Sequence, residues 1–395
     1  MDYKTGFFLA RAKDKSFDSW FLKGCSVLEG HPVLDTEKAV LIPKPSDLPE
    51  GTIQPDFKDS PYFEGFLESP ELVASFGFSS CIPSWNAVNP EGSWLEPELC
   101  FKIDGSWSPW IKMAYWAMDD GVLKRSSIKR YASNGLSVDT DTVKLDKPAA
   151  AFKFRFRLCM LQKKAAESQG NFIRIKAVFL SYSDPKPVCA QSTVSMPEER
   201  PEKSAKAVIL DTVPCCSQMV YPDGGDVWCS PTSVSMVLGY WQKDKGPCEP
   251  RVKAAVSGVY DRVYGGHGNW SFNVAYAGSQ AGMEAYAARF GSLSALEPWI
   301  KSGVPLVLSV SWNNEEGKTL SGAPVPKSAG HLTTLVGFDK CGDPVMNEPA
   351  SPTNETVRRT YRRSELETRW LLASGGLAYL IFPSGSDDED RARLF

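Results

Sequence analysis

The stretch that decides the fold of the second half of the chain is VPCCSQMVYPDGGDVWCSPTSVSMVLGYW, residues 213–241. A loop rich in Gly and Asp leads to Cys229, and a helical pattern begins directly after it, with Ser230 as a cap and Pro231 in the first turn. A thiol at a helix N-terminus meets the positive end of the helix dipole and unpaired N–H groups, and both favour the thiolate. Cys229 is therefore expected to have the environment that a cysteine nucleophile requires.

Histidine is scarce in this sequence, so few residues can act as a base toward that thiol. The 3 His residues are His31, His267 and His331. His331 follows Gly330 and opens an apolar strand, GHLTTLVGF, so we expect it to project into a cleft as the general base. His31 precedes Pro32 and is expected at the surface, whereas His267 lies in a glycine-rich loop and is expected to shape that loop or to line the cleft.

Two further polar positions complete the candidate site. Gln218 lies eleven residues before Cys229, and its amide could donate to a developing oxyanion. The strand after His331 ends in Asn347 and Glu348, either of which could orient the imidazole. In a regular hairpin, an even number of loop residues puts Glu348 on the same face as His331, and an odd number puts Asn347 there. The turn sequence DKCGD permits either, so both stay open.

These segments resemble the C39-like cysteine peptidases, a branch of the papain-like fold. Five blocks occur in the family's order over residues 213–383: SQ…YPDGGDVWCSPTSVSMVLGYW, GNWSFNVAYA, GHLTTLVGFD, NEPA and RRTYRRSELETRWLLASGGLAYLI. The resemblance implies Cys229 as nucleophile, His331 as general base and Gln218 as oxyanion donor. It also implies an acidic residue directly before Pro349 as the third member of the catalytic group. The family pattern there is Asn-Asp-Pro-Ala, whereas this chain has Glu348 in place of the Asp. We favour Glu348 on this basis.

Other residues around these blocks are candidates for binding the substrate: Trp228, His267, Asn269 and Trp270. A structural interpretation stands beside the catalytic one, because most free cysteines are buried thiols and an isolated buried His is usually a core residue. The DGGD loop is a weak signal for a cation site, so we expect neither a metal ion nor a cofactor.

The first half of the chain is typical of β-structure. AFKFRFRLCM, residues 151–160, alternates strictly between apolar and polar positions, as a half-buried strand does. Further strands are expected at 72–78, 94–103, 110–118 and 172–182, separated by turn clusters. We therefore predict a multidomain chain with an N-terminal antiparallel β-sandwich of the lectin or jelly-roll type and a C-terminal α+β papain-like domain.

The predicted boundaries are 1–185 for the sandwich, 186–212 for a linker rich in Pro, Ser and charge, 213–383 for the peptidase-like domain, and 384–395 for a mobile charged tail. Five Trp residues fall in the sandwich, and they could form a sugar-stacking surface or its core: Trp85, Trp94, Trp107, Trp110 and Trp116. Core burial is the commoner outcome, and a glycan ligand is the alternative.

Composition excludes several classes of protein. With 44 Lys and Arg against 47 Asp and Glu, the net charge of −3 argues against a nucleic-acid binder. No apolar run is long enough for a membrane helix, and no signal peptide is visible, so we expect a cytoplasmic protein, or a secreted one if a signal has been removed. The 10 Cys residues include no CxxC pair and are expected to be mostly buried thiols, with Cys215 and Cys216 as ordinary, partly buried ones. Disulfides stay possible and cannot be assigned from the spacing.

Three functions are compatible with these features. The first is hydrolysis of a peptide or amide bond through an acyl-enzyme on Cys229. The second is acyl transfer at the same site, with an amine in place of water. The third is a non-catalytic protein that binds a glycan or a protein through the Trp-rich sandwich.

Overall fold

The computed structural model describes residues 3–45, 48–184 and 207–385. Its contacts divide the chain into two compact units. One, the β-rich unit, comprises Gly6–Asp184 and Gly258–Ala281; the other, the α/β unit, comprises Met1–Thr5, Pro185–Ser257 and Gly282–Phe395. Residues 258–281, which the sequence placed with the second domain, thus join the first. Most of the predicted linker and of the predicted tail lies outside the described residues.

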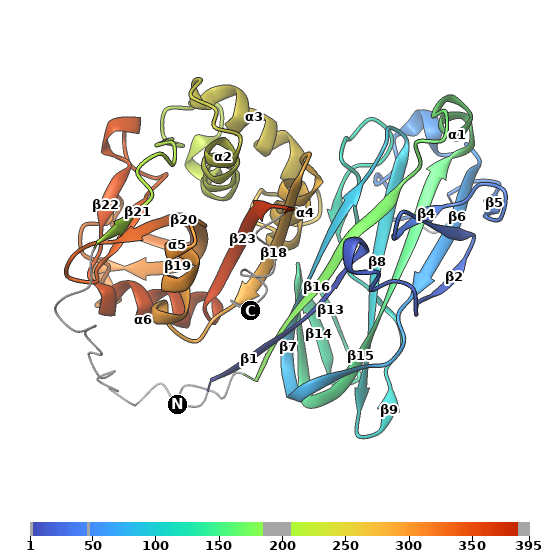
Figure 1. Ribbon diagram of the computed structural model, residues 1–395, viewed down its shortest axis with the longest axis horizontal. Coiled ribbons are helices and arrows are strands. Elements are labelled where there is room, and N and C mark those ends of the chain that lie inside the picture. The colour runs from blue at the N-terminus through green and yellow to red at the C-terminus, as the bar shows by residue number, and fades with distance from the viewer. Residues whose placement is uncertain (1–2, 46–47, 185–206, 386–395) are drawn as a thin grey trace. The chain divides into compact units, whose positions relative to one another are not determined.

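The β-rich unit is built almost wholly of strands, drawn from blue to green in Figure 1. Its strands are β1 (Lys4–Arg11), β2 (Phe21–Lys23), β3 (Cys25–Leu28), β4 (His31–Leu34), β5 (Val40–Ile42), β6 (Tyr62–Glu68), β7 (Leu72–Val88), β8 (Ser93–Ile103), β9 (Ser106–Trp107), β10 (Ile111–Lys112), β11 (Ala114–Tyr115), β12 (Ser126–Ser127), β13 (Tyr131–Ser133), β14 (Leu136–Asp139), β15 (Thr142–Leu161) and β16 (Arg174–Asp184). One short helix, α1 (Gln162–Glu167), follows β15.

Fourteen of these strands form one hydrogen-bonded sheet, whose central order is β10-β8-β15-β7-β16-β4-β3. The long strand β15 is its spine and pairs antiparallel with β6, β7 and β8. The predicted alternation is confirmed there. Phe152, Phe154 and Phe156 are buried, whereas the alternating Arg155 and Arg157 are half-buried and paired with glutamates. The largely β first half is therefore as predicted, and its description as a jelly-roll sandwich stays a prediction.

The tryptophan cluster divides into core and surface. Trp85, Trp94 and Trp116 are at most 1% exposed, so core burial is the correct interpretation for these three. Trp107 is exposed, and Trp110 is half-buried beneath the guanidinium of Arg155, 3.9 Å from its ring centre. The five residues therefore do not form one aromatic platform.

The segment 258–281 joins the β-rich unit through helix α4 (Trp270–Ser279), which packs against β7. Phe272 packs edge-on against both Trp85 and Trp116, which also contact each other. Asp141, next to β15, accepts a hydrogen bond from the Trp270 N–H at the start of the helix. This segment is therefore part of the core of the β-rich unit.

The α/β unit contains a seven-stranded sheet with central order β18-β23-β19-β20-β21-β22, and β17 pairs with β20. Its elements are β17 (Val208–Ile209), α2 (Cys229–Trp241), α3 (Cys248–Val259), β18 (Met283–Arg289), α5 (Glu297–Lys301), β19 (Leu306–Asn313), β20 (Lys327–Phe338), β21 (Pro344–Asn347), β22 (Arg358–Thr360), α6 (Arg363–Ser374) and β23 (Leu377–Pro383). The helix predicted after Cys229 is present as α2, and the strand predicted to begin at His331 lies within β20. The papain-like α+β description stays a prediction.

Helices cover both faces of this sheet, with α2 on one side and α6 on the other (Figure 1). The Ser233 hydroxyl donates to the carbonyl of Leu332 and so fastens α2 to β20. The Ser374 hydroxyl donates to the carbonyl of Ser309 and fastens α6 to β19. The first bond holds the N-terminal part of α2, which begins at Cys229, against β20, which contains His331.

A disulfide joins Cys216 to Cys248, the first residue of α3. The expectation that Cys216 is a free thiol is therefore wrong. Sequence spacing could not reveal this pair, because the two residues come together only when the 213–218 segment packs beside α3. Seven cysteines of the described chain are free, and Cys229 is among them.

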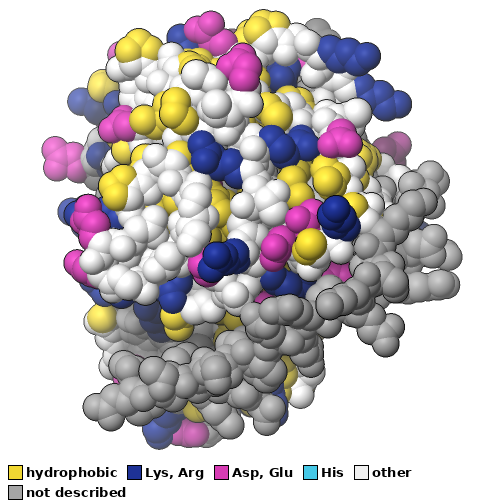
Figure 2. Space-filling view, turned by 90° about the vertical axis from the view of Figure 1, so that its left-hand side faces the viewer, with side chains coloured by type: hydrophobic (Ala, Val, Ile, Leu, Met, Phe, Trp, Pro, Cys, Tyr) yellow, Lys and Arg dark blue, Asp and Glu magenta, His cyan; other side chains and the backbone are white. Residues whose placement is uncertain are grey.

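One face of the molecule carries charges of both signs. Figure 2 shows Lys, Arg, Asp and Glu side chains interspersed with hydrophobic ones on this face, without a large area of a single charge. Among the helices of the described ranges, none is long and apolar enough to span a bilayer.

Candidate active site

Cys229 is the first residue of α2, as predicted, and its side chain is half-buried. The conformation of the loop that leads to Cys229 depends on Gly224 and Gly225 of the DGGD sequence. Gly224 has φ of 127°, a conformation that favours glycine, and a Cβ on Gly225 would lie 2.0 Å from the Gln218 carbonyl oxygen. Gly225 therefore lets the Gln218 backbone lie against the turn that precedes Cys229. Ser230 does not cap the helix but bonds the hydroxyl of Tyr379.

His331 and Glu348 form the polar centre of the site. The His331 Nε2 donates to Glu348 Oε1 at 2.5 Å, and the side chains of both residues are at most 5% exposed. The His331 ring also shares a hydrogen bond with the Cys229 thiol, and because Nε2 is engaged by the carboxylate, Nδ1 is the ring nitrogen that remains for it. Cys229, His331 and Glu348 are thus joined in one chain of hydrogen bonds.

A β-bulge decides which residue meets His331. The hairpin loop contains five residues, 339–343, between the pair Phe338–Pro344, so a regular hairpin would put Asn347 on the His331 face. The register shifts by one between Leu335 and Gly337, because Val336 is an extra residue in β20. This shift exchanges the two faces and brings Glu348 to His331.

Asn347 points to the other side of the strand and binds structural partners. Its amide donates to the carbonyls of Val213 and Pro214, and its oxygen accepts a hydrogen bond from Arg358. It therefore holds the segment that leads to Gln218 and does not contact His331.

The three groups shift one another's ionisation. Burial raises the pKa of the Cys229 thiol, but its hydrogen bond with His331 and the charge of that ring outweigh burial and lower the pKa below its usual value. Burial alone would lower the pKa of His331, whereas the Glu348 carboxylate and the bonds to both neighbours raise it to about 10. Burial also opposes ionisation of Glu348, yet His331 holds the pKa of Glu348 below its ordinary value. The site therefore favours a thiolate beside an imidazolium.

Three residues that the sequence did not indicate complete this centre. The Ala350 N–H donates to Glu348 Oε1 at 3.0 Å, and the Tyr361 hydroxyl donates to Oε2 at 3.2 Å. The Trp312 ring packs edge-on against the His331 ring with centres 5.2 Å apart. The Tyr lies in the RRTYRR block quoted above, but its distance along the chain from Glu348 gives no signal of a contact.

Comparison with known families agrees with this geometry. Residues 9–179 match the Peptidase C39 N-terminal domain, and residues 210–377 match the Peptidase C39 like family. The chain belongs to the C39-like peptidase family. Both compact units of the C39-like chain therefore have counterparts in that family, and the second match includes Cys229, His331 and Glu348.

A solved structure and the curated proteins add little to this assignment. A crystal structure of a candidate C39-like peptidase from Bacillus anthracis aligns with 46% of this chain and 100% of its own, at 16% identity and a TM-score of 0.34. A likeness at that level carries no argument about fold or function. No curated protein matches the chain.

In the C39-like chain, Gln218 is held close to the site by its backbone. Its N–H donates to the Pro349 carbonyl at 2.8 Å, one residue beyond Glu348. Its side chain is 2% exposed, and the amide Oε1 has no hydrogen-bond partner among the described residues. Buried amide oxygens normally have a partner, so this oxygen is an acceptor that an N–H or O–H group of a bound ligand could satisfy, whereas an oxyanion would need the N–H donors of the same amide.

The residues proposed for substrate binding have other visible contacts. Trp228 is buried against Tyr221, directly before Cys229. Asn269 caps α4 by accepting from the Phe272 N–H, and it donates to Asp261. His267, Asn269 and Trp270 belong to the β-rich unit, whereas Cys229 belongs to the α/β unit. A role in substrate binding for these residues stays a prediction.

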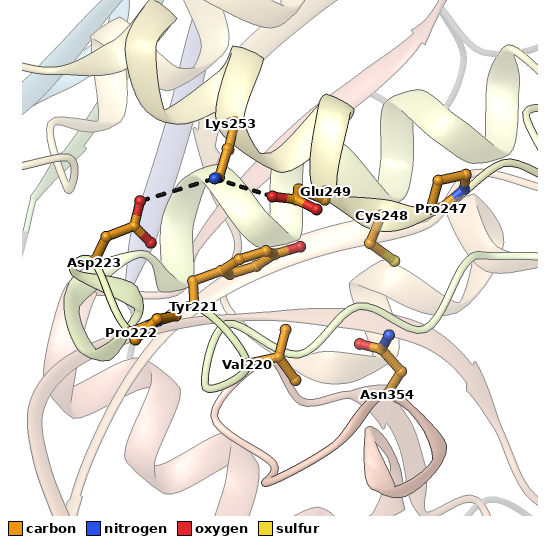
Figure 3. Close-up of a pocket in the computed structure, with 9 residues that line it drawn as sticks. All are labelled: Val220, Tyr221, Pro222, Asp223, Pro247, Cys248, Glu249, Lys253 and Asn354. Carbon is orange, nitrogen blue, oxygen red and sulfur yellow. Dashed lines mark ion pairs between the residues drawn. The ribbon is translucent and has the colours of Figure 1, made fainter.

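The loop between Gln218 and Cys229 also lines a cavity of about 540 Å³ (Figure 3). Tyr221 and Cys248 form its wall, and Lys253 lies between the carboxylates of Asp223 and Glu249, at 3.9 Å and 3.0 Å. Neither His331 nor Glu348 is among the residues that line it. Within the described ranges, this cavity included, no cluster of three or more His, Cys, Asp or Glu is arranged to hold a metal ion.

Proposed function

We propose that the chain is a cysteine hydrolase of peptide or amide bonds. The observation that carries the proposal is the hydrogen-bonded chain from Cys229 through His331 to Glu348. A thiolate beside an imidazolium is the reactive form of a cysteine nucleophile, and a buried carboxylate keeps the imidazolium charged and oriented. The family assignment supports the same class of reaction.

In the proposed reaction, the Cys229 thiolate attacks the carbonyl carbon of the scissile bond and forms a tetrahedral intermediate. His331 then gives its proton to the leaving amine as the C–N bond breaks, which leaves an acyl-enzyme on the thiol. Water attacks this thioester while His331 takes one of its protons, and the acid departs as the Cys229–acyl bond breaks. Glu348 stabilises the imidazolium in both steps without exchanging a proton.

Two donors are suited to the oxyanion of the tetrahedral intermediate. The N–H of Cys229 opens helix α2 and has no partner within that helix. The second donor is the side-chain amide of Gln218, whose backbone is held by the bond to Pro349 and by the close approach at Gly225. Donors fixed before the reaction stabilise a developing oxyanion without having to reorganise, and one such donor typically contributes about 10²–10³ in rate.

Labelling with an electrophilic peptide and mapping of the modified residue tests this proposal. We expect modification at Cys229 and loss of labelling in the Cys229→Ala and His331→Ala variants. Cys215 provides the matched control, because it is also a half-buried free thiol but has no histidine partner. Labelling of Cys215 in place of Cys229, or labelling of Cys229 that is unchanged in His331→Ala, would contradict a catalytic thiol.

A further inference from the structure

The glutamate at position 348 raises a positioning problem. A glutamate has one more rotatable bond than the aspartate of the family pattern, so more conformations must be excluded before its carboxylate faces His331. The Glu348 backbone is fixed, since its N–H donates to the Val357 carbonyl at 2.8 Å. The side chain still needs its own restraint.

The carboxylate has one fixed donor on each oxygen apart from His331. Oε1 accepts from the Ala350 N–H, two residues along the chain. Oε2 accepts from the Tyr361 hydroxyl, which is thirteen residues away and comes directly after β22. We propose that Tyr361 is a positioning residue of the active site, which holds the longer carboxylate of Glu348 in the orientation that keeps His331 aligned with Cys229. This inference rests on the proposed function and adds a residue to it.

The surroundings of Tyr361 are those of a fixed donor. The residue is 1% exposed, and its backbone N–H donates to the Pro344 carbonyl, so the ring is anchored beside β21. Burial and the negative charge of Glu348 raise the pKa of Tyr361, so the phenol keeps its proton and can only donate to the carboxylate. No other bond of this hydroxyl is formed within the described ranges, and its deep burial keeps it from the substrate. Its influence must therefore pass through Glu348.

Loss of this hydroxyl has a defined consequence. In Tyr361→Phe, Oε2 of Glu348 becomes a buried acceptor without a donor, and the carboxylate is free to turn away from Nε2. His331 then loses part of the stabilisation of its imidazolium, and a weaker imidazolium stabilises the Cys229 thiolate less. The pH at which the thiolate forms therefore rises, while the pH at which His331 loses its proton falls.

The chain offers a matched control for the substitution. Tyr286 is also fully buried in the α/β unit, and its hydroxyl donates to Glu284 at 2.6 Å. Tyr286→Phe removes the same kind of Tyr–Glu bond within β18, away from Cys229. It reports what the loss of a buried phenol does to the fold alone.

The experiment measures the rate of Cys229 alkylation by iodoacetamide against pH in the full chain, with mass mapping of the modified residue. This readout requires no known substrate. For Tyr361→Phe we expect a higher pH midpoint and a roughly tenfold lower rate at pH 6, with wild-type behaviour in Tyr286→Phe. In the Glu348→Gln background, Tyr361→Phe should have no further effect, because Tyr361 acts only through the carboxylate. Where a substrate is found, kcat should fall and KM should stay.

Three outcomes would overturn the inference: an unchanged midpoint in Tyr361→Phe, an equal change in Tyr286→Phe, or full additivity with Glu348→Gln. Failure of the proposed function would look different. In that case wild-type Cys229 itself would titrate as an ordinary thiol, and His331→Ala would leave its midpoint where it was.

Discussion

At the scale of single residues, the site depends on a balance between burial and charge. Burial opposes ionisation of both Cys229 and Glu348, and the charge of His331 reverses the effect for each. None of the three would hold its charge alone, so removal of one changes the ionisation of the other two. We expect the ion pair to form over a pH range that reaches from below the usual thiol pKa to about 10, where His331 loses its proton.

Gly225 tests whether the position of the Gln218 backbone matters for catalysis. We expect Gly225→Ala to lower kcat about 10-fold or more, because its Cβ would force the Gln218 carbonyl away from the turn before Cys229. Gly291→Ala is the control, since a Cβ there meets nothing within 4 Å. Steady-state kinetics and thermal unfolding of both variants would decide. Full activity in Gly225→Ala would contradict the requirement for this position of the Gln218 backbone.

Asp141 gives the β-rich unit a pH dependence of its own. Burial raises the pKa of Asp141 from 3.8 to about 7, so its folded state favours the protonated form. The free energy of unfolding should therefore fall as pH rises from about 4 to 7, by up to about 4 kcal/mol, and level off above that range. Asp141→Asn should remove this dependence. Urea unfolding at pH 5 and pH 8 measures it, and an equal pH dependence in the variant would contradict it.

At the scale of elements, much of the α/β unit is predictable from the sequence. Short apolar runs identify β19, β20 and β23, and the helical pattern after Cys229 identifies α2. The choice between Asn347 and Glu348 is not predictable, since it depends on one extra residue in β20. A Cβ on Gly337 would lie 2.3 Å from the Val208 carbonyl oxygen of β17, so the bulge lies where a neighbouring strand crosses closely. Residue spacing in the sequence does not indicate that β17 approaches β20 this closely.

The Cys216–Cys248 disulfide is a second feature that could not be predicted from the sequence. Cys216 and Cys248 are 32 residues apart, and in the chain-entropy model a cross-link closing a loop of that size stabilises by about 4 kcal/mol. We expect the Cys216→Ala, Cys248→Ala double variant to lose stability of that order, as measured by urea unfolding. Reduction of the wild-type protein should produce the same loss and leave the double variant unchanged. Equal stability of oxidised and reduced wild type would show that the bond does not constrain the fold.

At the scale of the whole molecule, neither compact unit is a single continuous stretch of the chain. Residues 258–281 leave the α/β unit, complete the core of the β-rich unit and return. The composition predicts a linker at 186–212 and the sequence blocks predict a second domain at 213–383, but neither indicates that residues 258–281 belong to the β-rich unit. The assignment cannot be predicted because Phe272 of α4 packs against Trp85 and Trp116, which lie more than 150 residues earlier in the chain.

Phe272 tests this division. It is fully buried, and we expect Phe272→Ala to destabilise the β-rich unit by about 3–5 kcal/mol. Hydrogen exchange should rise in β7 and β15, and much less in β19 and β20. Phe7→Ala is the control, because Phe7 lies in the same unit but is 39% exposed. Faster exchange confined to β19 and β20 would contradict the assignment of residues 258–281 to the β-rich unit.

His331 is expected to hold Cys229 as a thiolate. The most direct test of this expectation is the rate of alkylation of each free cysteine by iodoacetamide at pH 6, in wild type and in His331→Ala. Cys341 is the internal standard, because it is an exposed free thiol in the turn between β20 and β21. We expect half-buried Cys229 to react at least tenfold faster than Cys341, and this order to reverse in His331→Ala. Slower reaction of Cys229 than of Cys341 in the wild-type protein would contradict it.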